Sequence, residues 1–181
     1  MIFTLLFGAG CGISVQPLEA FDVTLNPTQD CTLTGSTSRD CTDAAQLALQ
    51  QTTGRWIFEQ EPAQSFTLTT EEGITLPGII FNDDGLVLNQ DPCLGAGAGA
   101  ICYFARRKFE SVDARNNNCT RFAELVAIVR RVDDGNFAGV LSDTQGADQS
   151  CGTSTVIQRI DNVAGKKAPE PSLAREEVPA P

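Results

Sequence analysis

Cysteine is the residue type with the most chemistry available to it in this chain. Seven cysteines are spread over 181 residues, and histidine is absent. No two cysteines form a Cys-x-x-Cys pair, so the spacing does not favour a zinc site, which needs several thiolate or imidazole ligands close together. Oxidation to disulfides is the chemistry that remains, and it belongs mainly to compartments outside the cytoplasm.

The first cysteine, Cys11, differs from the others in its surroundings. It follows an uncharged apolar run over residues 2–7 and the small residues Gly8, Ala9 and Gly10. An apolar run followed by small residues is typical of a secretory signal and its cleavage site. This segment resembles the lipobox of bacterial lipoproteins, although Gly8 stands where leucine is commonest and no Lys or Arg precedes the apolar run.

The lipobox resemblance implies that residues 1–10 are a signal peptide and that Cys11 becomes the lipid-bearing amino terminus. Two or more acyl chains, such as palmitate, give stable membrane anchoring. Gly12, in place of the aspartate that retains enteric lipoproteins at the inner membrane, implies the outer membrane of the cell envelope, on its periplasmic or surface side. The alternative is that residues 2–7 form a buried strand and that Cys11 is an ordinary thiol.

The six cysteines that remain form an even set, as expected for disulfides in an exported protein. Sequence alone allows many pairings. The prediction is pairing between neighbours in the chain: Cys31 with Cys41, Cys93 with Cys102, and Cys119 with Cys151.

Catalytic chemistry has few candidates. Without histidine, every His-dependent triad or dyad is excluded. Paired carboxylates remain possible, but many of them fall in predicted turns, as do Asp83, Asp84, Asp133 and Asp134. Trp56 and Tyr103 would suit a carbohydrate cleft, although aromatic residues at strand positions belong more often to a core. No catalytic residue is assigned.

The remaining motifs favour ordinary structural roles. The formal net charge of −10 repels nucleic acid and anionic headgroups. The run Gly95–Ala100 matches a dinucleotide fingerprint only formally, because a strand pattern follows it where a helix is required. The acidic turns lack EF-hand spacing, and the basic run 106–108 is typical of a solvated strand edge. The sequence thus predicts no cofactor, no metal and no nucleic-acid partner.

The elements that carry these residues are mainly short strands. A short helix is predicted over Asp43–Gln51, where good helix formers follow a capping residue. Period-two alternation then predicts about eight strands. They are Arg55–Gln60, Ser65–Thr69, Ile74–Phe81, Gly85–Gln90, Ile101–Phe109, Phe122–Val132, Asn136–Asp143 and Thr153–Asp161. Phe122–Val132 also fits a helical stripe, but its Val and Ile content favours a strand.

Asp-Gly turns and short connections between these strands predict an all-β fold, an antiparallel meander closed into a barrel or split into two packed sheets. The predicted organisation is a tether over residues 11–40, a disulfide-stapled β domain over 41–163 and a disordered tail over 164–181. The tail has almost nothing to bury and is rich in proline.

The segment Gly54-Arg55-Trp56 near the first predicted strand and Arg159 on the last one resemble features of small lipocalin-like barrels. This resemblance implies a cavity for a small apolar ligand in the barrel mouth. Five phenylalanines on the predicted strands would leave no pocket if all pointed inward: Phe58, Phe66, Phe81, Phe104 and Phe137.

These observations favour a non-catalytic, lipid-anchored envelope lipoprotein that binds a partner protein or a small ligand. Two alternatives stay open. One is a carboxylate-dependent enzyme that acts on glycans, and the other is a structural spacer subunit of an envelope assembly.

Overall fold

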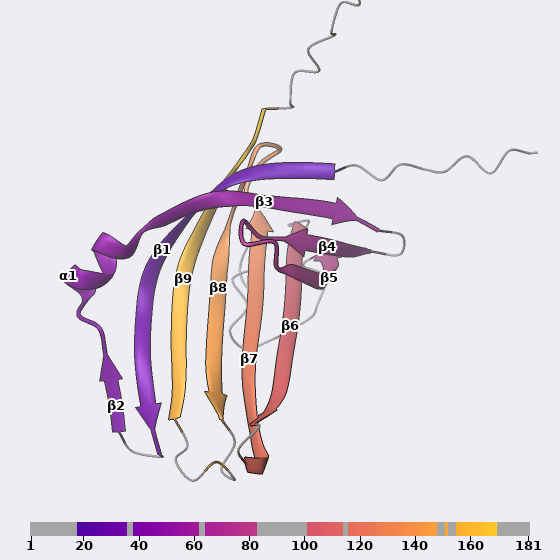
Figure 1. Ribbon diagram of the computed structural model, residues 1–181. Coiled ribbons are helices and arrows are strands. Elements are labelled where there is room, and N and C mark those ends of the chain that lie inside the picture. The colour runs from indigo at the N-terminus through magenta and orange to yellow at the C-terminus, as the bar shows by residue number, and fades with distance from the viewer. Residues whose placement is uncertain are drawn as a thin grey trace, which may run out of the picture.

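The protein is described by a computed structural model, which covers residues 18–35, 38–61, 64–82, 101–113, 116–147, 151 and 155–169. In chain order the elements are β1 (Leu18–Thr34), β2 (Ser38–Cys41), α1 (Ala44–Leu47), the 3₁₀ turn η1 (Ala48–Gln50), β3 (Thr52–Gln60), β4 (Ser65–Thr69), β5 (Thr75–Asn82), β6 (Ile101–Asp113), β7 (Asn116–Arg131), β8 (Asn136–Ala147) and β9 (Thr155–Lys167). The all-β prediction is confirmed, and the architecture is a closed barrel (Figure 1).

The barrel is an antiparallel meander that β1 closes. Strands β3 to β9 each pair with the next along the chain, and β1 pairs with both β3 and β9. This gives eight barrel strands, β1 and β3–β9. The short β2 pairs only with the far end of β1, through Cys31 to Thr34. Where all eight strands pair, closure removes the free edges that an open sheet would expose.

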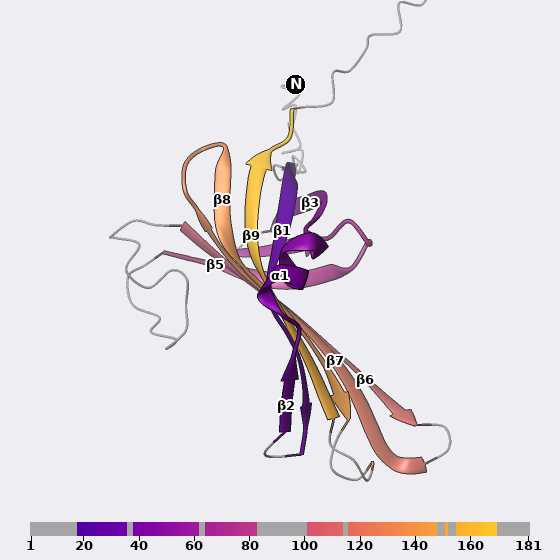
Figure 2. The ribbon, with the colours of Figure 1, turned by 90° about the vertical axis from the view of Figure 1, so that its left-hand side faces the viewer.

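Strand length divides the molecule into two parts. Strands β3, β4 and β5 have 9, 5 and 8 residues, whereas β1 and β6–β9 have 12 to 17. All eight strands form the closed part, here called the upper barrel. The longer strands continue beyond it as an open twisted sheet with β2 at one edge, here called the lower sheet (Figures 1 and 2).

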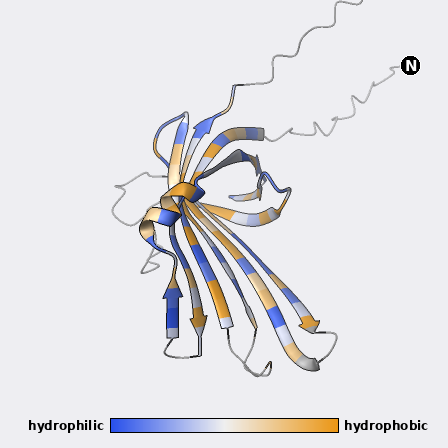
Figure 3. Ribbon diagram, turned by 60° about the vertical axis from the view of Figure 1, so that its left-hand side comes forward, coloured by the Kyte–Doolittle hydropathy of each residue, from blue (hydrophilic) through white to orange (hydrophobic). Residues whose placement is uncertain are grey.

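Alternation of side chains along each strand builds the core of the upper barrel. Trp56 and Phe58 on β3 are buried, as are Phe66 and Leu68 on β4, while most of their neighbours are polar. Successive side chains point to opposite faces of a strand. The apolar side chains of the different strands therefore pack against one another inside the barrel. Figure 3 shows this alternation as changing hydropathy along the ribbons.

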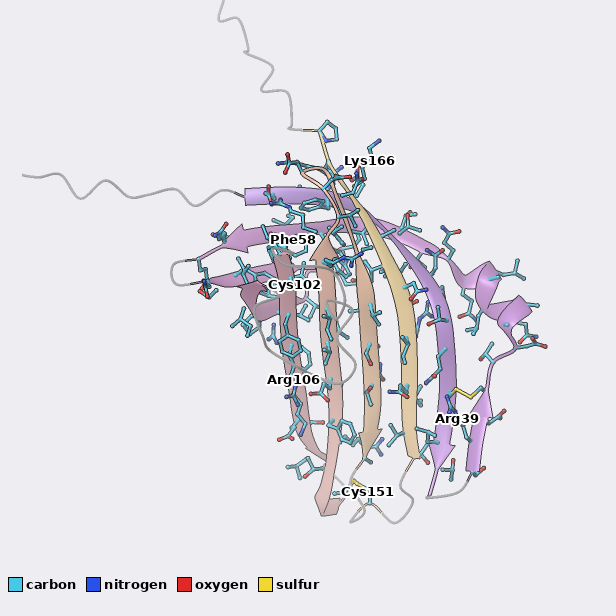
Figure 4. All side chains as sticks on the ribbon, turned by 180° about the vertical axis from the view of Figure 1, so that it is seen from behind. Arg39, Phe58, Cys102, Arg106, Cys151 and Lys166 are labelled. Atoms are coloured by element: carbon cyan, nitrogen blue, oxygen red, sulfur yellow. A yellow bond between two sulfur atoms is a disulfide. The ribbon has the colours of Figure 1, made fainter. Side chains whose placement is uncertain are left out.

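An aromatic cluster fills the upper end of the barrel. The ring of Phe58 lies 5.4 Å from Phe21, 5.8 Å from Phe66, 5.4 Å from Tyr103 and 5.5 Å from Phe137, measured between centroids. Figure 4 places Phe58 among these strands near the top of the molecule. Burial in this cluster raises the pKa of Tyr103, because desolvation disfavours the phenolate.

Ion pairs close this filled end. Glu19 on β1 accepts from Arg131 on β7 at 2.5 Å and from Lys167 on β9 at 3.1 Å. The free volume between Glu19, Arg131 and the aromatic rings is only about 10 Å³, too small for a ligand. The upper end is therefore a packed core.

Two of the three predicted disulfides lie within the described residues, and both are confirmed. Cys31 on β1 joins Cys41 on β2, and Cys119 on β7 joins Cys151. Cys102 is also disulfide-bonded. Its predicted partner Cys93 lies outside the described residues.

The predicted short helix is confirmed as α1 followed by η1. Asp43 is its N-cap and accepts from the backbone N–H of Ala45 at 3.4 Å, which satisfies one of the unpaired donors at a helix start. Leu47 is buried. Among the described residues, no helix has the length and apolar character needed to span a membrane.

The predicted tether over residues 11–40 is wrong for most of its length, because Leu18–Thr34 forms the longest strand of the barrel. Phe21, Val23 and Leu25 alternate with polar residues, as a strand requires. Pro27 obscures this pattern, and it sits where the pairing of β1 with β9 shifts register. A proline lacks the backbone N–H of the ladder and is tolerated at such irregularities.

Two further predictions need correction. The β domain does not end at residue 163, because β9 continues to Lys167. On β6 it is Tyr103 and Ala105 that belong to the core, so Phe104 between them faces outward. The predicted strand Gly85–Gln90 lies outside the described residues, whereas Phe122–Val132 is a strand, within β7.

Candidate ligand-binding site

A cavity of about 400 Å³ lies where the three short strands end and the lower sheet begins. Its volume falls within the range of small-molecule sites. The exposed residues Thr52 and Glu72 stand at its edge and leave it accessible to solvent. Its apolar wall consists of Val23, Leu25, Trp56, Ile74, Leu125 and Leu141.

The polar part of the wall comes from β8 and β9. In the register of these strands Asp143 faces Arg159 and Leu141 faces Asp161. Residues two apart on one strand share a face, so all four side chains point inward together. The inward face thus changes from apolar to charged at the level where β3, β4 and β5 stop covering it.

Arg159 and Asp161 form a two-pronged ion pair inside the cavity. The Nε and Nη2 atoms of Arg159 lie 3.1 Å from Oδ2 and Oδ1 of Asp161, respectively. The Asp161 side chain is only 4% exposed. Hydrogen bonding to Asp161 raises the pKa of Arg159, so the guanidinium is held charged. Its remaining nitrogen donates to Gln50 of η1 at 3.4 Å.

Two residues that line the cavity each carry a buried oxygen atom with no hydrogen-bond partner among the described residues: Thr70 Oγ1 and Asp143 Oδ1. Thr70 follows β4 and is 6% exposed. Asp143 uses its other oxygen to accept from Gln145 at 3.2 Å. Buried polar atoms in folded proteins are nearly always hydrogen-bonded, so these two atoms have bonding capacity that no described residue uses.

The two inner carboxylates of the cavity have different partners. Asp143 and Asp161 line one cavity, which meets the first requirement of a carboxylate pair. However, both oxygens of Asp161 already accept hydrogen bonds from Arg159. Within the described residues no three metal-binding side chains gather at one point.

The structure places the predicted residues in different regions. Trp56 and Arg159 both line the cavity. Tyr103 belongs to the filled upper core and does not line this cavity. Asp133 caps the turn between β7 and β8, where hydrogen bonds from the Asn136 side chain and the Gly135 backbone lower its pKa.

The predicted basic run is engaged in ordinary surface interactions. Arg106 pairs with Glu124 and Lys108 pairs with Glu110, each at 2.5 Å. Arg107 lies 4.5 Å from the ring centroid of Phe109. Figure 4 shows Arg106 on β6 well below Phe58. Four residues or segments from the sequence analysis lie outside the described residues: Cys11, Asp83, Asp84 and Gly95–Ala100.

Sequence reasoning missed Thr70, Asp143 and Asp161. Asp143 and Asp161 alternate in phase with Leu141 and Val163, and this spacing is the one signal that could have placed them on an inward face. Comparison of the chain with protein-family models and with curated protein sequences finds no match.

Proposed function

We propose that the protein is a non-catalytic binding protein of the bacterial cell envelope, anchored by a lipid on Cys11, that holds a small ligand in the cavity below Trp56. The cavity itself is the observation that carries this proposal. It combines an apolar wall with two polar residues, Thr70 and Asp143, whose buried oxygen atoms have no hydrogen-bond partner within the described part of the chain, and small-ligand sites have this composition.

The disulfides support the proposed location. Cys31–Cys41 and Cys119–Cys151 are bonds that persist in oxidising compartments such as the periplasm and the cell surface. Together with the lipobox-like segment before Cys11, they favour an exported protein. The outer membrane remains the proposed site, on the basis of Gly12.

The position at which β1 starts indicates which end of the barrel the proposed lipid anchor would hold near the membrane. Six residues, 12–17, separate Cys11 from β1, and an extended chain of this length spans at most about 20 Å. β1 starts at the filled upper end, where Glu19 pairs with Arg131 (Figure 1). A lipid on Cys11 would therefore hold the filled end close to the membrane and leave the lower sheet pointing away.

The binding proposal predicts that filling the cavity abolishes binding. Leu125 lines the cavity, whereas Val126, the next residue on β7, faces the other side of the sheet. The Leu125→Trp protein should lose at least about tenfold in affinity for the neutral apolar dye Nile red, a change of about 1.4 kcal/mol. The Val126→Trp protein should bind like the unaltered chain.

The measurement is a fluorescence titration of Nile red against the three proteins, with circular dichroism to confirm that each is folded. Failure of the unaltered protein to bind the dye would contradict the proposal. So would equal binding by the Leu125→Trp and Val126→Trp proteins, since the dye would then sit elsewhere.

A further inference from the structure

We infer that the cavity takes a small primary amine, with its ammonium group at Asp143 and Thr70 and its apolar body against Trp56 and the aliphatic wall. This inference rests on the proposed binding function and names the class of ligand. It follows from the charges in the cavity, from the two unpartnered oxygen atoms and from the shape of the wall.

The charge of the cavity favours a cation. Four carboxylates line it, those of Glu71, Glu72, Asp143 and Asp161, against one guanidinium, that of Arg159. Arg159 pairs with Asp161 and also interacts electrostatically with Asp143, which faces it on the neighbouring strand. The inner wall thus holds two carboxylates against one guanidinium and keeps a net negative charge, with Glu71 and Glu72 exposed at the rim. A cation entering from solvent meets negative charge first at the rim and then at the inner wall, which favours its capture.

The unpartnered atoms favour a hydrogen-bond donor. Asp143 Oδ1 can only accept a hydrogen bond, and Thr70 Oγ1 can accept as well as donate. An alkylammonium group offers three N–H donors and no acceptor. Its donors therefore suit the acceptor at either residue, whereas a carboxylate ligand would place acceptor against acceptor at Asp143.

The wall favours an apolar body of modest size. Val23, Leu25, Leu125 and Leu141 present only hydrocarbon to the cavity. Trp56 is 2% exposed and also lines it, and an indole ring attracts cations as well as alkyl groups. A volume of about 400 Å³ admits a short alkyl chain together with its head group.

Three probes that share a six-carbon chain test the head-group preference: hexylammonium, hexan-1-ol and hexanoate. Isothermal titration calorimetry at neutral pH and low salt should show hexylammonium binding at least about tenfold more tightly than hexan-1-ol. Hexanoate should bind more weakly than both. Raised salt should weaken hexylammonium binding and leave hexan-1-ol unchanged, because screening acts on charges.

Matched variants test whether Asp143 and Thr70 cause the preference for an ammonium head group. Asp143→Asn keeps the shape and removes the charge, so hexylammonium affinity should fall about tenfold while hexan-1-ol affinity stays within about twofold. Asp134→Asn removes the same charge from the exposed turn between β7 and β8 and should change neither affinity. Thr70→Val should weaken the binding of hexylammonium and of hexan-1-ol without lowering the melting temperature, because the hydroxyl it removes has no partner among the residues that the structure describes.

The outcomes separate this inference from the proposed function. If Nile red binds and hexylammonium binds no better than hexan-1-ol or hexanoate, the amine inference falls and the binding function stands. If Asp134→Asn lowers hexylammonium affinity as much as Asp143→Asn does, the preference comes from net charge alone and the inference again falls. If neither the dye nor any of the three probes binds, both proposals fall.

Discussion

Replacing Phe58 by alanine should lower the free energy of unfolding by about 3–5 kcal/mol. Phe58 is 6% exposed, and its ring contacts four other aromatic rings. Removal of the ring loses its burial and leaves a hole, because the surrounding strands are joined around the barrel and cannot collapse into it. The free energy of unfolding of an ordinary domain is only about 5–15 kcal/mol, so a loss of this size should be readily measured.

A matched substitution tests whether the effect belongs to the aromatic cluster. Phe109 on β6 is 40% exposed and lies in the lower sheet, so Phe109→Ala should cost less than about 1 kcal/mol. Denaturant unfolding of both variants, with disulfides intact, can be followed by the fluorescence of Trp56, the single tryptophan. Equal losses for the two variants would contradict a packed upper core.

Replacing Arg159 by methionine should cost about 3 kcal/mol, the lower end of the range for breaking a buried ion pair. The substitution leaves Asp161, with its side chain 4% exposed, as a buried charge without its partner. The Arg159 side chain is itself 32% exposed. Water that reaches the site should therefore reduce the loss of stability. The hydrogen bond to Gln50, which ties η1 to the barrel, is lost as well.

Two controls accompany the Arg159 substitution. Arg55 pairs with Asp22 at 2.7 Å, but both side chains are more than half exposed, so Arg55→Met should change stability by less than about 1 kcal/mol. The double variant Arg159→Met/Asp161→Leu should recover most of the loss, because the buried Asp161 carboxylate that lost its partner is removed as well. A double variant as unstable as Arg159→Met would mean that packing, and not charge, explains the effect.

The strands that sequence predicted best are those with one polar face. On β3 and β4, Thr, Ser, Glu and Gln separate Trp56, Phe58, Phe66 and Leu68, so the pattern indicates which side chains are buried. On β6 both faces carry apolar residues, such as Tyr103 inward and Phe104 outward, and the inward face could not be identified. On β1 the proline at position 27 masked a strand that tertiary pairing with β9 stabilises.

The cavity could not be predicted from local patterns. It depends on the difference in length between β3–β5 and the other barrel strands, and on pairing between segments more than one hundred residues apart, such as Val23 with Gly165. Sequence could identify Trp56 and Arg159 as residues of interest. It could not show that Thr70, in a turn after β4, comes to the same cavity as Asp143 and Arg159.

The most direct test of a ligand site below Trp56 is a nuclear magnetic resonance titration of the isotope-labelled protein with hexan-1-ol and then with hexylammonium. We predict that the indole N–H of Trp56 and the amides of Thr70 and Leu141 shift on binding, while the amides of Gly135 and Val112 do not. Shifts confined to the exposed apolar residues Ile79, Val112 and Ile157, or no shift at all, would contradict the account.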